Sequence, residues 1–237
     1  MSVGAAVVVV PFLVLGVVAG LLAGAVLIGA VVGLLAGVLS AAAFIVPAWR
    51  QAERRVVALL GATPADSIEH ARLFNIVEGL CTAAGLPRPQ IFVLDQEAPN
   101  AMTLGRDPRH GCLIVTEGLL GKLNRIELEG VVAHELSHLR AGDALPPTIA
   151  LALYARNPAV ARRVVAVVSD PVREAVADLA GVSLTRYPPG LISALEHLRA
   201  DNEVVRGVPE ATASLWLRPL DLQYDTVDAR IGALREL

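Results

Sequence analysis

Residues 131–140 read VVAHELSHLR and contain the pattern His-Glu-x-x-His within an apolar helical stretch. On an α-helix, His134 and His138 project from one face one turn apart, while Glu135 sits about 100° round from His134. This arrangement offers two imidazole nitrogens to one Zn²⁺ ion and a carboxylate to the water beside it. The pentapeptide arises by chance in a chain of this length at a frequency on the order of one percent, so its surroundings must support the assignment.

The surroundings predict that the motif lies in the middle of a helix. Asn124 followed by Glu127 is typical of an N-cap with a capping box, and Gly142 is typical of the residue just past a helix C-terminus. Both histidines would then belong to regular helix, which their spacing requires.

A third metal ligand is expected downstream, because a hydrolytic zinc site needs three protein ligands and a fourth position kept for water. Glu174 and Asp178 are also one helical turn apart. If Glu174 binds the metal, Asp178 faces the same site and can fix a ligand histidine through a hydrogen bond. Taken alone, these two carboxylates would more often form a solvated acidic face; beside the histidine motif, we favour the metal site. Four small residues keep this second helix narrow enough for close approach: Ala175, Ala177, Ala180 and Gly181.

Several segments, in this order, resemble the M48 family of metallopeptidases, which includes the HtpX heat-shock membrane proteases and the Ste24 prenyl-protein proteases. The segments are residues 99–101, 114–120, 127–138, 174–178 and 211–220. The chain departs from the family pattern at Ser214, where a His is usual, and at Arg218, where an Asn is usual. It also lacks the additional membrane spans that HtpX-like members carry between the histidine helix and the third ligand. The resemblance implies proteolysis of membrane or misfolded proteins.

The first 49 residues are exceptionally apolar. The chain is 54% hydrophobic with a mean hydropathy of +0.58, against about 45–50% apolar residues in ordinary soluble domains. No charged side chain occurs from Met1 to Trp49, and a helix of that length would extend about 73 Å, more than twice a bilayer core. The pattern predicts a transmembrane helical hairpin with spans at Val3–Leu22 and Ala25–Val46, ending near Pro47.

Glycines recur every four residues within these two predicted spans, at Gly16, Gly20 and Gly24 and again at Gly29, Gly33 and Gly37. Such repeats let membrane helices pack closely, and a homo-oligomer formed through these glycine-lined helices is one candidate assembly. An alternative is that glycine is simply common in membrane helices.

Charge beside the second predicted span indicates the topology. Arg50, Arg54 and Arg55 follow it, and positive charge next to a span tends to stay in the cytoplasm. We therefore expect a multi-pass protein of the cell membrane, with a hairpin at 1–49 and a cytoplasmic catalytic domain at 50–237. The net charge of −3 and the lack of a basic cluster with aromatic partners argue against nucleic-acid binding. Cys81 and Cys112 lack metal-type spacing and are expected to be buried, reduced thiols.

The part after residue 50 predicts one α+β domain, mainly helical, of zincin type, with a small β-sheet. Strands are expected at 90–94, 101–104 and 112–116, with a hairpin loop at 105–111. Helices are expected at 66–84, 146–168, 191–198 and 221–237. The segment at 146–168 is expected to be a cytoplasmic helical connection, because its longest uncharged run is too short for a span.

The predicted chemistry is zinc-dependent endopeptidase activity on polypeptide substrates, with one Zn²⁺ per chain held by His134, His138 and Glu174, and Asp178 behind them. Glu135 is expected to act as the general base toward the attacking water. Tyr187, His197 and Arg218 are side chains of the right type to stabilise the oxyanion, and sequence does not rank them.

Two alternatives remain. An intramembrane protease also uses His-Glu-x-x-His, but charged residues flank this helix, which makes burial in lipid costly. The other alternative is a catalytically silent scaffold or partner-binding subunit, which is anchored in the membrane and keeps the zinc.

Overall fold

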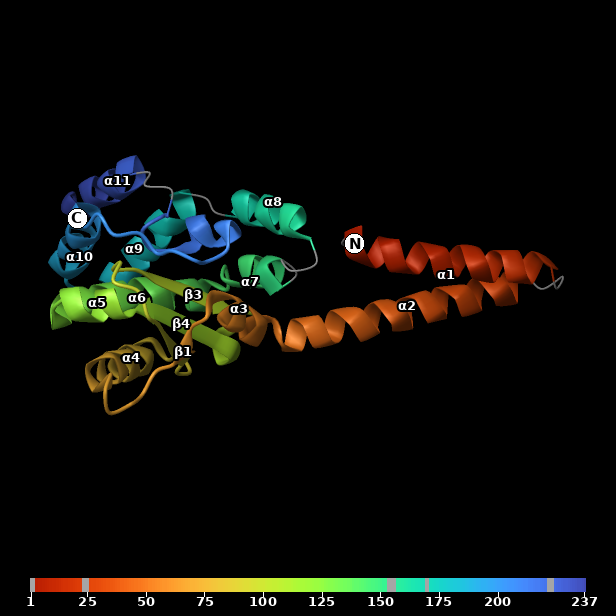
Figure 1. Cartoon of the computed structure of the whole chain (residues 1–237), viewed down its shortest axis with the longest axis horizontal. Coiled ribbons are helices and arrows are strands. Elements are labelled where there is room, and N and C mark those ends of the chain that lie inside the picture. Colours follow the sequence, from red (N-terminus) through yellow and green to blue (C-terminus); the bar gives the residue numbers. More distant parts are fainter. Residues whose placement is uncertain (1–2, 23–25, 153–156, 169–170, 221–223) are drawn as a thin grey trace. The chain divides into compact units, whose positions relative to one another are not determined.

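The computed structural model describes residues 3–22, 26–152, 157–168, 171–220 and 224–237. Contacts within the chain divide it into two compact units, Met1–Gln51 and Ala52–Leu237 (Figure 1). Each unit has its own set of elements and is described separately below.

The first unit is a pair of antiparallel helices, α1 (Val3–Leu22) and α2 (Val26–Arg50). A Cβ atom added at Gly16 would lie 2.0 Å from the carbonyl oxygen of Gly29 and 2.8 Å from the Cα of Gly33. Small residues are therefore required where the two backbones meet, as the glycine spacing predicted. The glycines at this contact pack within one chain.

The second of these helices continues beyond the predicted span. Pro47 lies inside α2, which continues to Arg50, and residues 23–25, including the predicted first residue of that span, lie outside the described residues. Among the described residues, no helix has the combination of length and apolar character that crossing a membrane requires. The structure therefore has helices at both predicted segments, but it does not show that either helix crosses a membrane.

The second unit contains a mixed sheet of four strands, ordered β1-β2-β4-β3 among the described residues. The strands are β1 (Thr63–Pro64), β2 (Gln90–Leu94), β3 (Ala101–Gly105) and β4 (Gly111–Thr116). β2 pairs parallel with β4, whereas β1–β2 and β3–β4 are antiparallel. The three predicted strands are confirmed to within one residue. β1 was not predicted, since two exposed residues carry no periodic pattern.

Hydrophobic clusters cover both faces of the sheet. On β4, Leu113 and Val115 belong to one cluster with residues of α4, α6, α10 and α11. Their neighbours Cys112 and Ile114 belong to a second cluster with residues of α3, α7 and η2. This alternation follows from the two-residue period of a strand. Cys112 and Cys81 are free and buried, as predicted, and burial raises the pKa of the Cys112 thiol to about 12.

Helices make up most of the second unit, which confirms an α+β fold that is mainly helical with a small sheet. They are α3 (Ala52–Leu60), α4 (Ala71–Ala84), α5 (Glu117–Lys122), α6 (Arg125–Ala141), α7 (Leu145–Ala152), α8 (Pro158–Val168), α9 (Pro171–Thr185), α10 (Pro188–Ala200) and α11 (Tyr224–Arg235), with short 3₁₀ turns η1 (Pro108–His110) and η2 (Glu210–Leu215).

Two predicted helix starts were wrong. The helix expected from Asp66 begins at Ala71, because the Asp66 carboxylate accepts hydrogen bonds from the backbone of Ile68 and Glu69 and holds a turn there. Pro188, predicted to precede its helix, is instead the first residue of α10, a position where the missing N–H costs nothing.

Candidate metal centre

The His-Glu-x-x-His motif lies in the middle of α6, as predicted. The Asn124 side chain accepts hydrogen bonds from the backbone of Ile126 and Glu127, and the Glu127 carboxylate accepts one from the Asn124 backbone at 2.9 Å. At the other end, Gly142 adopts a left-handed conformation with φ 73°, which glycine tolerates without strain. Local capping therefore sets both limits of the helix that carries His134 and His138.

Close contact between α6 and α9 brings the second predicted segment to the motif. A Cβ atom added at Gly181 of α9 would lie 2.8 Å from the backbone nitrogen of His134 and 3.0 Å from its Cα. The glycine thus lets α9 approach the backbone of α6 at the first histidine. Glu174 and Asp178, on the same helix as Gly181, face this contact.

Three side chains converge there, and their nearest atoms are close to equidistant. His134 Nε2 lies 3.2 Å from His138 Nε2 and 3.4 Å from Glu174 Oε2. His138 Nε2 lies 3.6 Å from Glu174 Oε1. Both histidines are buried, and Glu174 is partly buried. Within the described part of the chain, this is the one group of at least three such side chains close enough to hold a metal ion.

The far nitrogen of each histidine contacts a different aspartate. His134 Nδ1 donates to Asp178 Oδ1 at 2.7 Å, and His138 Nδ1 donates to Asp143 at 3.0 Å and 3.2 Å. These contacts place a proton on each Nδ1 and leave each Nε2 as an acceptor. Asp178 was predicted in this role. Asp143 was missed, although its position five residues after His138, just past the end of α6, is a local signal that could have identified it.

The electrostatics favour a positive charge at the convergence point. Burial alone would lower the pKa of His134, but the carboxylates of Asp178 and Glu174 raise it to about 9. Burial opposes ionisation of Glu174, yet hydrogen bonding and charge from His134, with the charges of Arg230 and His138, hold the pKa of this carboxyl well below its usual range. Three acceptor atoms facing one another are stabilised by a cation between them, either a proton or a metal ion.

Zinc fits this donor set. With metal–ligand bonds of about 2.0–2.2 Å, the ligand atoms of a tetrahedral site lie about 3.4 Å apart. The separations of 3.2 Å between the two Nε2 atoms and 3.4 Å between His134 Nε2 and Glu174 Oε2 match that edge length, and His138 Nε2 lies 3.6 Å from the other carboxylate oxygen, Oε1. Two imidazoles and one carboxylate are also a combination that zinc uses in hydrolytic enzymes, and carboxylate partners behind the histidines are typical of such sites.

Two arginines at this centre were not predicted. Arg230 of α11 donates from Nε and from a terminal nitrogen to the two oxygens of Asp178, both at 2.7 Å. Arg173 of α9 donates to Glu174 Oε1 at 2.8 Å and lies 3.3 Å from Asp143. Glu135 is buried, with 2% of its surface exposed, and its charge acts on Arg230.

The three candidates for an oxyanion donor lie in other surroundings. Arg218 is buried and donates to the carbonyl oxygens of Leu198, Asp201 and Glu203. His197 is on α10 with a largely exposed side chain, 3.1 Å from Glu127. Tyr187, just before α10, is half exposed.

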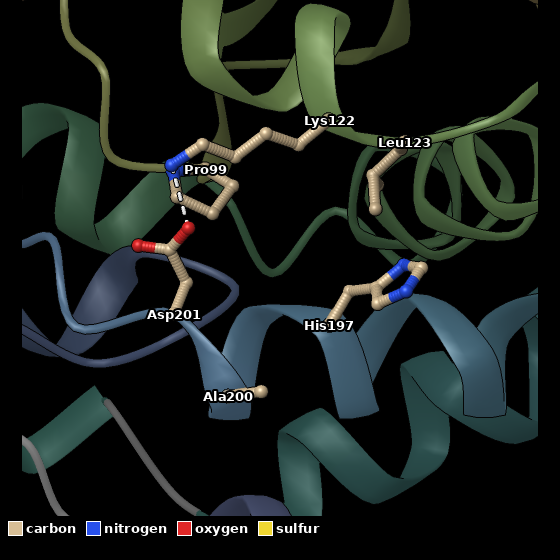
Figure 2. Close-up of a pocket in the computed structure, with 6 residues that line it drawn as sticks. All are labelled: Pro99, Lys122, Leu123, His197, Ala200 and Asp201. Atoms are coloured by element: carbon tan, nitrogen blue, oxygen red, sulfur yellow. Dashed lines mark hydrogen bonds and ion pairs between the residues drawn. The ribbon is translucent and has the colours of Figure 1, made fainter.

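A cavity of about 220 Å³ lies elsewhere, lined by Pro99, Lys122, Leu123, His197, Ala200 and Asp201. Figure 2 shows the Lys122 ammonium pointing at the Asp201 carboxylate, 2.5 Å away. The two charged groups at this cavity therefore neutralise each other. Its lining shares no residue with the His134 cluster.

Comparison with known proteins agrees with this geometry. A family model described as Peptidase family M48 matches residues 67–175. The chain is 33% identical to a protein named Protease HtpX homolog from Dictyoglomus thermophilum, over 72% of this chain and 68% of the relative. Proteins of the same name from Acidiphilium cryptum (36% identical; 78% of this chain and 77% of the relative) and Thermoanaerobacter pseudethanolicus (32%; 80% of each) are also similar. With relatives this similar over most of their length, the chain belongs to peptidase family M48 and is a metallopeptidase related to the HtpX proteases.

Proposed function

We propose that this chain is a zinc-dependent endopeptidase in which His134, His138 and Glu174 hold one zinc ion and Glu135 is the general base. The observation that carries the proposal is the convergence of two imidazole nitrogens and the Glu174 carboxylate, with the nearest atoms of each pair of side chains 3.2–3.6 Å apart. A buried cluster of acceptors without a cation would be strongly unfavourable. A zinc ion bound there would supply a Lewis acid that lowers the pKa of water and stabilises developing negative charge.

The residues of the chain have separate tasks in this proposal. Asp178 and Asp143 orient the two imidazole rings, so that each Nε2 would be available to hold the ion. Glu135 follows His134 on α6 and is buried; its carboxylate oxygen takes a proton from the attacking water and later delivers it to the leaving amine. The buried position of this carboxylate limits competition from bulk water.

Polypeptide substrates fit the outer edge of the sheet, where an added strand can pair through main-chain hydrogen bonds. β3 is one of the two edge strands of the sheet among the described residues, and α6 packs against it. The carbonyl of Ala101 accepts from Leu217 N at 2.8 Å, and Gly105 N donates to Thr148 Oγ1 at 2.9 Å. Because alternate residues direct their backbone groups to the same side of a strand, Thr103 lies between these two contacts and directs its backbone to the same edge. We infer that an extended substrate pairs along β3, whose five residues are buried in this structure, and we propose membrane or misfolded proteins as the substrate class.

The test of catalysis compares two glutamates on the same helix. Glu135→Gln should keep the fold and the zinc but lower cleavage of an unfolded protein such as casein by roughly 10²–10⁴-fold, the usual worth of a positioned acid–base group. Glu129→Gln, a partly exposed position on α6, is the matched control and should retain activity. Activity should also vanish with a chelator and return with zinc.

Three results would contradict parts of this proposal. Cleavage that survives both Glu135→Gln and chelation would show that another group carries the chemistry. A wild-type protein that binds zinc and cleaves nothing would instead favour the zinc-binding scaffold. Full zinc content in Glu174→Ala, measured by elemental analysis, would place the third ligand elsewhere.

We also propose that residues 1–49 attach the peptidase to a membrane, with the catalytic unit in the cytoplasm. The absence of charge before Arg50 supports this proposal. So does the described surface of α1 and α2 before Arg50, where the exposed large side chains are apolar, among them Phe12, Leu15, Leu35 and Leu39; such a surface marks contact with lipid or protein. Homo-oligomer formation stays a prediction.

Fractionation and fusions test the membrane proposal. The full chain should remain in the membrane pellet after high-salt and alkaline washes and move to the soluble fraction with detergent. Reporters fused before Met1 and after Leu237 should both indicate cytoplasm, because a hairpin returns the chain to its starting side. Recovery of the protein in the alkaline wash would refute membrane insertion, and reporters on opposite sides would refute the hairpin.

A further inference from the structure

We propose that Arg230 of the C-terminal helix α11 is a positioning residue of the metal site, acting through Asp178 on the ring of His134. This inference rests on the proposed function, because it assumes that His134 is a ligand. It adds a part of the chain, α11, that neither the motif nor the family match over residues 67–175 includes.

The contacts of Arg230 are specific in direction. Its Nε and one terminal nitrogen each lie 2.7 Å from a different oxygen of Asp178. This two-point pairing fixes the plane of the carboxylate, which a single contact would leave free to rotate. Asp178 Oδ1, held in this way, also accepts from His134 Nδ1 at 2.7 Å. The orientation of the imidazole ring therefore depends on the guanidinium behind the aspartate.

The remaining nitrogen of Arg230 ties the site to the rest of the fold. It donates to the Leu217 carbonyl at 2.8 Å and lies 3.6 Å from Glu174 Oε2. Leu217 in turn donates to the carbonyl of Ala101, at the start of β3. One side chain thus joins α11, the edge of the sheet and a proposed metal ligand, so movement of α11 would be transmitted to the site.

Burial distinguishes this arginine from its neighbours on the same helix. Arg230 is only 8% exposed, and a buried guanidinium is retained only when its charge and donors are matched. Arg235 of α11 also pairs with an acid, Glu196, but both side chains are largely exposed. Arg235 therefore offers a matched control with the same residue type, the same helix and an ion pair.

In this proposal Arg230 sets the orientation of the Asp178 carboxylate, which is a different role from anchoring α11. If Arg230 only held the helix in place, a lysine that keeps the charge and most of the packing would serve nearly as well. A single ammonium group cannot reproduce the two parallel contacts with Asp178. We therefore expect Arg230→Lys to fold normally and still alter the metal site.

The experiment measures metal binding to the full chain, with zinc competition against a chelating dye and with Co²⁺ absorption as a readout of ligand geometry. Arg230→Lys and Arg230→Met should raise the zinc Kd by roughly 10–100-fold, the usual effect of losing a group behind a ligand, and should change the Co²⁺ band. Arg235→Met should leave both unchanged. Far-ultraviolet circular dichroism checks that each variant is folded; if Arg230→Met does not fold, Arg230→Lys carries the test.

A double-mutant cycle tests the route through Asp178. In an Asp178→Asn background, Arg230→Lys should have much less effect on the zinc Kd than in the wild type, because the two residues act as one unit. Equal zinc affinity and an unchanged Co²⁺ band in Arg230→Lys, with a wild type that binds zinc, would overturn the positioning role alone. Fully additive effects would do the same. A wild type that binds neither metal would overturn the proposed metal site, and this inference with it.

Discussion

Replacing Gly181 with alanine is the sharpest test of how the two helices of the metal centre meet. The added Cβ would lie 2.8 Å from His134 N, 3.0 Å from His134 Cα and 3.1 Å from the carbonyl carbon of Ala133. All three are backbone atoms of α6, so no side chain can turn away to make room. Since carbon contacts are favourable at about 3.5–4.0 Å, α9 must move from α6 by roughly 0.6 Å.

The expected cost follows from that displacement. Overpacking of this kind costs about 1–3 kcal/mol in unfolding free energy, and for a domain of this size about 2–4 °C in Tm is lost per kcal/mol. The same shift moves Glu174, two turns away on α9, relative to His134. A site must be held within about 0.5 Å of its working geometry, so we expect the zinc Kd to rise by roughly 10-fold or more.

Gly79→Ala provides the control for helix propensity. Gly79 lies within α4 and is exposed, and an added Cβ there meets no atom within 4 Å. Alanine should therefore stabilise the protein by about 0.5–1 kcal/mol and leave zinc binding unchanged. Differential scanning calorimetry and dye competition measure the two effects. A Gly181→Ala protein with wild-type Tm and zinc affinity would refute the close contact between α6 and α9.

Three further predictions concern stability. Burial alone would raise the pKa of Glu127, but hydrogen bonds from Ser193 and the N-cap backbone, with the charge of His197, lower it. The unfolded chain therefore takes up this proton at a higher pH than the folded protein does. The unfolding free energy should fall as the pH drops below about 4.3. Glu127→Gln should be less stable at pH 7 by about 1 kcal/mol and show a shallower pH dependence in urea unfolding; parallel pH curves would contradict this. Arg218→Met should lose about 3 kcal/mol, because three backbone carbonyls lose their donor, and an unchanged urea midpoint would count against that network. Zinc at about 1,000 times its Kd should stabilise the wild type by about 4 kcal/mol and should not stabilise Glu174→Ala; equal shifts in both would place the metal elsewhere.

The sequence predicted those helix and strand limits that depend on interactions between neighbouring residues. The limits of α6 follow from Asn124, Glu127 and Gly142, which act within one turn of the helix ends. The three longer strands follow from apolar runs between turn residues. The start of α4 was misplaced because Asp66 suits both a helix N-cap and an isolated turn, and only the structure shows which backbone groups it binds.

The sequence could not identify Arg230 and Arg173 as residues of the site, because their contacts form only in the folded protein. Arg230 is 52 residues from Asp178, and a lone arginine in a polar helix carries no mark of burial. Arg173 stands beside Glu174 in the sequence, yet its contact with Asp143 depends on α9 folding back to the end of α6. Such pairs form only when distant helices pack, so residue spacing along the chain does not encode them.

Charge balance shows why the two arginines belong to the metal centre and not only to the packing of the helices. Four carboxylates surround the site, those of Glu135, Asp143, Glu174 and Asp178, and two guanidinium groups contact three of them. With the imidazoles neutral, these groups leave a net charge of −2, which a divalent cation offsets. Loss of either arginine would leave uncompensated negative charge even with the metal bound, in surroundings where unpaired charge is costly. Each carboxylate oxygen of Glu174 is near one arginine, Oε1 at 2.8 Å from Arg173 and Oε2 at 3.6 Å from Arg230, and both positive charges favour the ionised form that a metal ligand requires.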